Sequence, residues 1–318
     1  MKINTVTGPA DTATLGSTLM HEHISCADWS MRMNFGSRFF EVDDMARIAS
    51  AMIAKMKREC GITTVVDGTP INLGRDVKLI HEVSNRTGVN FIVSSGFYYQ
   101  EDAWLMFRPE GEIVELLMNE CMNGIADTGI LPGIMKCAVC DAGITPLIRK
   151  ILTSVGRVAA KTGLPIFCHH TVSDKNGGEI LDMFEKTAVP LNRVIMGHSG
   201  DTDDLSYLEG MLKRGCYIGE DRFGYCEMTL SLERRVAAIA ALCDKGYGNR
   251  ILLSHDLVAY GAFAGSWDDF KNSKPEEKYP DFTFIHKSVQ PALLAAGVTM
   301  TMFDKMMTEN PRNFFEGE

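Results

Sequence analysis

The sequence predicts an α/β fold, namely a single (β/α)8 barrel of the triosephosphate isomerase (TIM) type with a metal site at the carboxyl ends of its strands. Short apolar runs alternate along the chain with longer segments of helical period, which is the pattern of successive β-α units around a parallel sheet. Metal-binding residue types, mainly histidine, stand where several of these runs end. The chain of 318 residues exceeds the roughly 250 that such a barrel takes, so we expect one domain over residues 1–318.

The eight expected strands are short apolar runs rich in β-branched residues. They cover residues 17–23, 63–67, 90–95, 130–136, 165–169, 193–197, 216–219 and 250–254. The expected helices carry apolar residues every three or four positions. They cover residues 42–60, 75–87, 112–127, 145–161, 178–188, 204–213 and 228–245. We expect residues 1–18 to form a hairpin or plug. Residues 257–281 are expected to be a long substrate loop, since barrels keep their binding loops after the strands.

The composition argues against several classes of function. The net charge of −9 does not suit nucleic acid, because binding to phosphates needs a basic surface. No apolar run approaches the ~20 residues that cross a bilayer, so no membrane partner is expected. The chain starts without the basic and apolar regions of a secretory signal, and its nine cysteines are scattered. We therefore expect a cytoplasmic protein with reduced thiols that acts on a small molecule.

His21 and His23 flank Glu22 at the end of the first expected strand. Side chains two positions apart on a strand point to the same face, so both imidazoles can reach one metal ion. Two histidines that only form hydrogen bonds are the alternative, but the paired spacing favours ligands. Asp256 follows the last expected strand, beside His255. It either supplies a carboxylate ligand to the same site or caps a helix.

His198 ends the sixth expected strand, and the neighbours His169 and His170 end the fifth. Adjacent strand residues point to opposite faces, so only one of His169 and His170 can face a common site unless the strand bulges. Periodicity does not choose between them. The other histidine is expected to be a packed or hydrogen-bonded neighbour.

Lys136 ends the fourth expected strand, and its position permits three interpretations. It is a structural residue in a salt bridge, a lysine that forms a Schiff base, or a desolvated lysine that reacts as the free amine. Reaction of the free amine with carbon dioxide would give a carbamate, an anionic oxygen ligand able to bridge two metal ions.

Cys137 and Cys140 form a CxxC pattern, but a zinc site of this type needs a second pair and the chain has none. We expect these cysteines to be incidental buried residues. The chain also lacks a GxSxG motif, a P-loop and a dinucleotide-binding glycine fingerprint. The sequence therefore disfavours hydrolysis by a serine nucleophile and any reaction that uses a nucleotide.

These residues and their surroundings resemble the phosphotriesterase-like branch of the amidohydrolase superfamily, a family of (β/α)8 barrels that includes phosphotriesterases and lactonases. The matching stretches are residues 18–23, 66–67, 73–76, 95–98, 133–136, 170–171, 197–207, 221–224, 253–256 and 309–315. The match to the family's His-Thr pair selects His170 over His169.

The resemblance implies a site with two divalent metal ions. It implies that His21, His23 and Asp256 bind the more buried ion. The more exposed ion is then bound by His170 and His198. Zinc is the expected metal, with manganese, iron and cobalt as alternatives, because all of them accept imidazole and carboxylate ligands.

The resemblance also implies that carboxylated Lys136 and a hydroxide bridge the two ions, with Asp256 as general base. Tyr98 and Arg222 resemble residues that lactonase-type members place beside the substrate. Asp201 is implied to pair with Arg222 or to relay a proton outward.

The expected activity is hydrolysis of a lactone or related carboxyl ester, with side activity on phosphotriesters. A phosphotriesterase or an N-acyl amide hydrolase is the alternative on the same site. From other classes, we consider a Schiff-base lyase that uses Lys136 and a metal-binding scaffold without catalysis. By the resemblance, the expected assembly is a homodimer.

Overall fold

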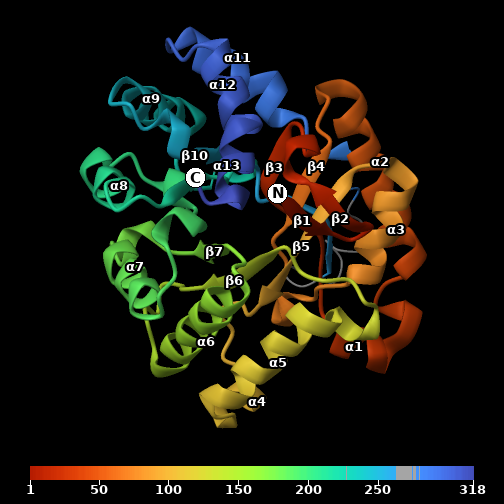
Figure 1. Ribbon diagram of the computed structural model, residues 1–318. Coiled ribbons are helices and arrows are strands. Elements are labelled where there is room, and N and C mark those ends of the chain that lie inside the picture. Colours follow the sequence, from red (N-terminus) through yellow and green to blue (C-terminus); the bar gives the residue numbers. More distant parts are fainter. Residues whose placement is uncertain (227, 263–273, 275–276, 279) are drawn as a thin grey trace.

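A computed structural model describes residues 1–226, 228–262, 274, 277–278 and 280–318 (Figure 1). Within these residues, eight parallel strands pair in chain order in a curled sheet. They are β3 (Thr18–Ala27), β4 (Thr64–Asp67), β5 (Asn90–Gly96), β6 (Ile134–Ala138), β7 (Ile166–His169), β8 (Val194–Gly197), β9 (Tyr217–Glu220) and β10 (Ile251–Leu253). Each overlaps one of the predicted strands.

The first and last of these strands meet and close the barrel. The backbone N–H of Asp256 donates to the carbonyl of His21 at 3.1 Å, and the N–H of His23 donates to the carbonyl of Leu257 at 2.9 Å. A further strand, β11 (Val258–Ala262), continues in parallel beside β3. The predicted (β/α)8 barrel is confirmed. The expected loop over 257–281 begins instead with β11, and most of its remaining residues lie outside the described part of the chain.

Helices surround the strands in Figure 1. The helices that follow the strands are α2 (Val42–Cys60), α3 (Val77–Thr87), α5 (Glu110–Asn123), α6 (Pro146–Thr162), α7 (Gly177–Lys186), α8 (Leu205–Leu212) and α9 (Leu232–Asp244). The others are α1 (Trp29–Phe35), α4 (Ala103–Phe107), α11 (Gln290–Ala295), α12 (Met300–Met307) and α13 (Glu309–Glu316).

Capping residues explain where two helices differ from the prediction. Helix α9 begins at Leu232 rather than at residue 228, because the Ser231 side chain accepts a hydrogen bond from the N–H of Arg234. Helix α5 ends at Asn123 rather than at residue 127, because Gly124 has a φ of 100° and the backbone leaves the helix there.

The core has two layers, separated by the strands. The inner layer fills the barrel with one apolar residue from each strand, namely Met20, Val66, Ile92, Ile134, Phe167, Ile195, Tyr217 and Leu252. Ile3 and Leu15 join this layer with Phe314 and Phe315 of α13. In Figure 1 both chain termini lie near the centre of the ring, where the antiparallel hairpin of β1 (Lys2–Thr5) and β2 (Gly8–Asp11) covers one end of the barrel.

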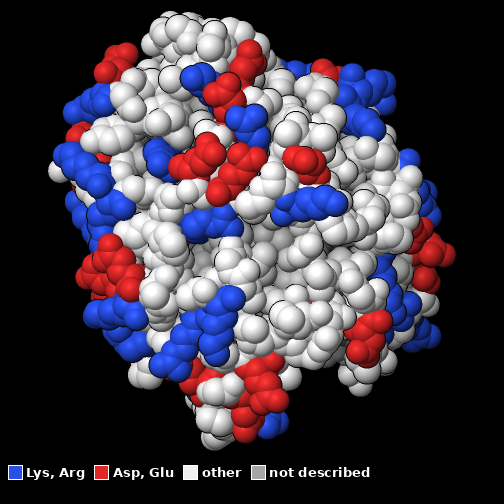
Figure 2. Space-filling view, viewed as in Figure 1, with Lys and Arg blue, Asp and Glu red and all other residues white. Residues whose placement is uncertain are grey.

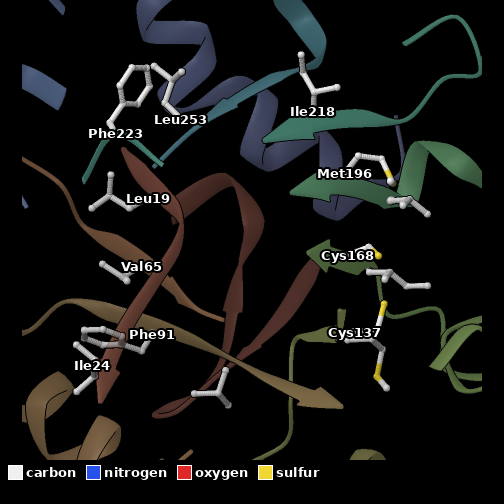
Figure 3. Close-up of a cluster of buried hydrophobic side chains, with 14 of the residues drawn as sticks. Leu19, Ile24, Val65, Phe91, Cys137, Cys168, Met196, Ile218, Phe223 and Leu253 are labelled. Atoms are coloured by element: carbon white, nitrogen blue, oxygen red, sulfur yellow. The ribbon is translucent and has the colours of Figure 1, made fainter. Parts of the chain in front are cut away.

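The outer layer packs the other faces of the strands against the helices, and Figure 3 shows part of it. Cys137 and Cys168 belong to this layer and are both buried and free. Cys137 of the CxxC pattern is therefore buried as expected, whereas Cys140 is only partly buried.

A bulge in β3 turns its histidines into the barrel. Leu19 and Ile24 both belong to the outer layer, although strict alternation would place residues five positions apart on opposite faces. The pairing of β3 with β4 shifts register between Leu19 and Glu22, where β3 has one residue more than β4. This extra residue brings Ile24 to the same face as Leu19. His21 and His23 therefore follow Met20 onto the inner face.

No helix of the described ranges combines the length and the apolar character needed to span a bilayer. On the face seen in Figure 2, acidic and basic side chains are interspersed. That face offers no broad basic surface of the kind that binds nucleic acid.

Candidate metal centre

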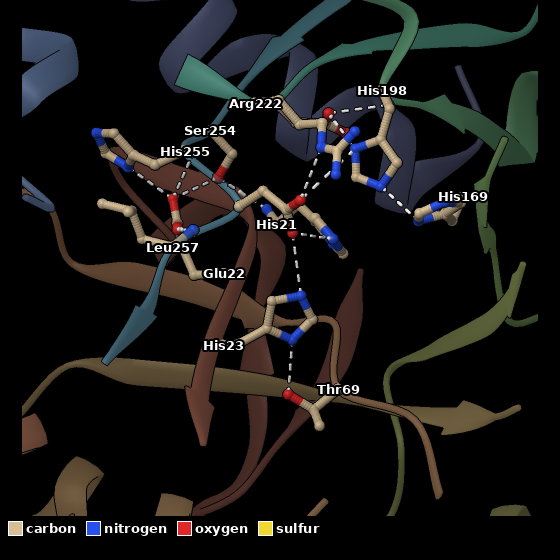
Figure 4. Close-up of polar contacts among 12 residues, drawn as sticks. His21, Glu22, His23, Thr69, His169, His198, Arg222, Ser254, His255 and Leu257 are labelled. Carbon is tan, nitrogen blue, oxygen red and sulfur yellow. Dashed lines mark hydrogen bonds and ion pairs between the residues drawn. The ribbon is translucent and has the colours of Figure 1, made fainter. Parts of the chain in front are cut away.

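Six polar side chains gather at the carboxyl end of the barrel, and all of them are buried. They are His21 and His23 of β3, Lys136 of β6, His169 of β7, His198 directly after β8 and Asp256 after β10. Figure 4 shows the cluster around Asp256. The six side chains come from five different strands or from the residues after them, so closure of the barrel is what brings them together.

The Asp256 carboxylate lies at the centre of the cluster. Its Oδ1 is 3.0 Å from His21 Nε2 and 3.1 Å from His23 Nε2, and its Oδ2 is 3.9 Å from His198 Nδ1. Burial by itself raises the pKa of this carboxyl group. Electrostatic interactions with His198 and His21 and the hydrogen bonds from His21 and His23 outweigh burial, so the pKa lies well below its usual value. Asp256 is therefore an anion in the buried site.

His198 is oriented by Asp221. Both the backbone N–H of His198 and its ring Nδ1 lie 2.9 Å from Asp221 Oδ1, which turns Nε2 toward His169 Nδ1 at 2.8 Å. His198 has a φ of 64° and Asp256 a φ of 60°. Non-glycine residues in this left-handed region cost roughly 1–3 kcal/mol each and occur preferentially at functional sites.

The structure corrects the placement expected for His170. Its ring points away from the cluster, where Nδ1 lies 2.6 Å from the carbonyl of Gly197 and the ring lies near Tyr207. His169 faces the cluster instead, because Phe167 belongs to the inner layer and side chains two positions apart share a face. The match to a His-Thr pair selected His170, whereas the structure places His169 in the cluster and His170 outside it.

Lys136 is buried with its Nζ 3.5 Å from His21 Nε2 and 4.1 Å from the centre of the Phe167 ring. It forms no ion pair with any described residue, which disfavours the structural salt bridge that the sequence left open. Burial lowers the pKa of Lys136 to about 8. Near neutral pH the side chain therefore holds an appreciable fraction of free amine.

The donor set fits divalent metal ions. Burial lowers the pKa of His21 to about 3 and holds the pKa values of His169 and His198 well below the usual value. Neutral imidazole is the form that binds a metal. Burial also acts to lower the pKa of His23, but Cys26 and Asp256 raise it above its usual value. A metal ion would therefore have to displace a proton from His23.

Metal binding is also favoured by distances within the cluster. Ligand atoms of His21, His198 and Asp256 all lie within 4.8 Å of one another. His21 Nδ1 is buried without a hydrogen-bond partner among the described residues. Imidazole and carboxylate groups at this separation suit zinc, manganese, iron and cobalt alike.

Arg222 forms one wall of the mouth of the site. Its Nε donates to Asp256 Oδ2 at 3.2 Å and its Nη1 donates to Asp201 Oδ2 at 2.7 Å. The other oxygen of Asp201 accepts from buried Arg235 at 2.5 Å. The ion pair expected between Asp201 and Arg222 is therefore present, and Arg235 anchors it from behind.

Tyr98 lies beside His169, with the two rings 5.3 Å apart. The backbone N–H of Tyr98 donates to Asn72 Oδ1 at 2.6 Å, and Asn72 Nδ2 donates to Asp102 Oδ2 at 2.8 Å. Asp102 thus helps to hold the loop that carries Tyr98. Tyr98 thus lies beside His169, while Arg222 links Asp201 to Asp256.

A model of the phosphotriesterase family matches residues 1–315 of the chain. This protein belongs to the phosphotriesterase family. The family is part of the amidohydrolase superfamily, and its members are metal-dependent hydrolases. The chain is therefore a metal-dependent hydrolase of the phosphotriesterase family, and the buried cluster around Asp256 is its candidate metal site.

Relatives of this phosphotriesterase-family member cover almost its whole length. A phosphotriesterase homology protein of Mycobacterium tuberculosis is 34% identical over 99% of this chain and 98% of its own. An aryldialkylphosphatase of Saccharolobus solfataricus is 28% identical over 95% of each chain, and an N-acetyltaurine hydrolase of Rattus norvegicus is 23% identical over 98% and 97%. A solved structure of the phosphotriesterase from Mycobacterium tuberculosis superimposes with a TM-score of 0.89 and 33% identity, over 99% and 98% of the two chains.

Four neighbours of the site in this family member had no role assigned from the sequence. Asp221 orients His198, and Thr69 Oγ1 lies 2.8 Å from His23 Nδ1, which fixes that ring. Glu22 and His255 form a buried pair behind the cluster. Asp221 follows β9 directly, so its position at a strand end could have identified it from the sequence as a residue of the site. Thr69 lies two residues beyond β4 and carries no such signal.

Proposed function

We propose that this protein hydrolyses lactones at a site that holds two divalent metal ions. His21, His23 and Asp256 would hold one ion. The second ion would be held by His169 and His198. When bound, such ions polarise a substrate oxygen and lower the pKa of water, which are the two requirements of ester hydrolysis near neutral pH.

Lys136 is proposed to carry a carbamate between the two ions. The neutral amine attacks carbon dioxide to form a nitrogen–carbon bond, and the nitrogen then releases one proton to solvent. The product is an anionic oxygen ligand in place of a cation. Support comes from the lowered pKa of about 8, from burial and from the lack of an ion pair with any described residue. A buried cation beside His21 would otherwise repel a metal ion.

Asp256 is proposed as the proton carrier. Hydrolysis of a lactone breaks the acyl carbon–oxygen bond, adds water and gives a hydroxy acid. Asp256 Oδ2 would accept the proton that the attacking water loses and return it to the departing oxygen. The hydrogen bond from Arg222 Nε to the same oxygen holds that atom in place.

The position of Arg222 is the main reason for proposing a lactone as the substrate. Two of its nitrogens are held by Asp256 and Asp201, while Nη2 has no acceptor among the described residues. A guanidinium fixed in this way can donate to the carbonyl or ring oxygen of an ester beside the metal site. Tyr98, whose ring lies beside His169, would supply a phenol and a ring face for the rest of the substrate.

A panel of lactones, phosphotriesters and N-acyl amides tests this proposal with the metal-replete protein. We expect kcat/KM for at least one lactone to exceed that for every phosphotriester by roughly a hundredfold, which is about 2.7 kcal/mol in the transition state. The aryldialkylphosphatase and N-acetyltaurine hydrolase among the relatives make the other two classes the specific alternatives. Equal or faster turnover of either class would reject the lactonase assignment and leave the metal site intact.

The Schiff-base alternative is tested separately. A lysine that forms a Schiff base is trapped by borohydride with its carbonyl substrate, whereas a carbamate gives no adduct. We expect no mass increase on Lys136 after such treatment. An adduct on Lys136 would favour the lyase.

We also propose a homodimer in the cytoplasm. Exposed apolar side chains on neighbouring helices support the dimer, since such groups mark protein interfaces. They are Met106 and Phe107 of α4 and Leu116 and Met122 of α5. Sedimentation equilibrium tests the assembly, and a monomer at every concentration would reject it.

A further inference from the structure

We propose that the buried pair of Glu22 and His255 is a positioning device that holds Asp256 in register with His21 and His23. Neither member of the pair faces the metal site, yet each is a direct sequence neighbour of a proposed ligand. The inference rests on the proposed metal site, because it concerns how the chain orients the ligands of that site.

The Glu22 carboxylate is completely buried and is surrounded by donors from one short segment. Its Oε1 accepts from Ser254 Oγ at 2.8 Å, from the backbone N–H of His255 at 2.8 Å and from His255 Nδ1 at 2.7 Å. Its Oε2 accepts from the N–H of Leu257 at 2.9 Å. One side chain of β3 therefore binds the backbone on both sides of Asp256.

These hydrogen bonds restrict the position of Asp256 relative to the histidine ligands. Glu22 lies between His21 and His23 on the strand and points to the opposite face. Ser254 Oγ, which donates to Glu22, also accepts from the backbone N–H of His21 at 2.8 Å. The segment that carries Asp256 can therefore not slide along β3 without breaking several buried hydrogen bonds at once.

His255 extends the constraint to a third segment. Its Nδ1 donates to Glu22, and its Nε2 accepts from the backbone N–H of Ile285 at 3.1 Å, so both ring nitrogens are held in place. In the sequence, Leu257 and Ile285 stand at the two ends of the long segment that comes after β10. Both are thus tied to the same pair, as Figure 4 shows for Leu257.

A buried carboxylate with four good donors is stable, but one that loses a donor is not, because the remaining charge stays away from water. The pair should therefore act as a unit. Removal of either member should let Asp256 move relative to His21 and His23, and outer groups that orient metal ligands typically change metal affinity by roughly 10–100-fold.

The test measures the affinity of full-length protein for zinc by competition with a chromophoric chelator in the presence of bicarbonate. Glu22→Gln places an amide N–H₂ against one of the donors, and His255→Phe keeps the ring shape without either nitrogen. Asn310→Ala is the matched control. Asn310 is equally buried and donates to the carbonyls of Gly248 and Ile251, at the opposite end of β10.

We expect Glu22→Gln and His255→Phe each to weaken zinc binding by roughly 10–100-fold, and the double variant to be no weaker than the poorer single variant. His255→Asn keeps a donor toward Glu22 and should lose less affinity than His255→Phe. Asn310→Ala should lower the melting temperature and bind zinc like the wild type. Circular dichroism checks that each variant is folded.

Wild-type zinc affinity in folded Glu22→Gln and His255→Phe would overturn the inference, as would an equal loss in Asn310→Ala. If Glu22→Gln does not fold, the two His255 variants decide the question, because His255→Phe leaves three donors on the carboxylate and His255→Asn keeps a fourth. Failure of the wild type to bind zinc would reject the proposed function itself, so the two failures are distinguishable.

Discussion

His169 Nδ1 and His198 Nε2 face each other at 2.8 Å across the mouth of the barrel. Both rings are buried, and burial keeps both pKa values well below the usual value, so at neutral pH two uncharged imidazoles point nitrogen atoms at one another. One neutral imidazole can donate its N–H to the other, so a divalent ion held by both rings would take the place of this hydrogen bond. We propose His169 and His198 as the ligands of the more exposed ion.

The first prediction separates the two adjacent histidines. His169→Ala should lose about one of two bound metal ions per chain and at least roughly tenfold in activity. His170→Asn keeps a donor toward the carbonyl of Gly197 and should retain both ions. Elemental analysis after reconstitution with bicarbonate measures this difference. The reverse ranking would restore His170 as the ligand.

The second prediction concerns Lys136. Protein loaded with metal in ¹³C-bicarbonate should show one carbamate carbon signal by NMR, and that signal should be absent in Lys136→Gln. Because carbamate formation consumes the free amine, incorporation into metal-free protein should rise as the pH increases through about 8. Short carboxylic acids should partly restore metal binding in the variant. Full metal content in untreated Lys136→Gln would contradict the bridging role.

The third prediction concerns substrate contacts. Tyr98→Phe and Arg222→Met should each lower kcat/KM for the preferred substrate by roughly tenfold or more, because each removes a hydrogen-bond donor at the mouth. Metal content should not change, since neither side chain belongs to the proposed ligand set. A variant that loses metal together with activity would show that its residue supports the metal site and not the substrate.

The fourth prediction concerns stability and uses buried Glu220. Burial raises the pKa of this carboxyl group from 4.5 to about 7, since the charge of Asp201 adds to burial and Arg235 only partly offsets them. The folded state then holds the proton more tightly than the unfolded state, so stability falls as the pH rises from 4.5 to 7. Glu220→Gln mimics the protonated acid and should lack this loss.

Urea unfolding at pH 5 and pH 8 measures the effect of Glu220→Gln. We expect the variant to match the wild type at pH 5 and to exceed it at pH 8 by up to about 3 kcal/mol, the energy equivalent of this pKa difference. Glu112→Gln, on the exposed face of α5, is the control and should change neither value. Destabilisation by Glu220→Gln at pH 8 would show that the carboxylate is stabilised as the ion-pair partner of Arg235.

The periodicity of the sequence determined the order of strands and helices, because period-two and period-3.6 patterns are local properties of the chain. The same patterns placed His21, His23, Lys136, His198 and Asp256 at strand ends. In a parallel barrel all of these ends meet at one face, so their convergence followed from the fold class alone. The ends of α5 and α9 were less well predicted, because single capping residues decide them.

Tertiary structure decided which neighbour of an adjacent pair faces the site. A strand of a parallel barrel is apolar on both faces, so the run 166–168 does not reveal whether Ile166 or Phe167 points inward. Packing of Phe167 inside the barrel decides which residues of this strand point inward and turns His169 toward the cluster around Asp256. The Glu22–His255 pair depends on closure of the first strand against the last, a contact between residues 233 positions apart that no local pattern encodes.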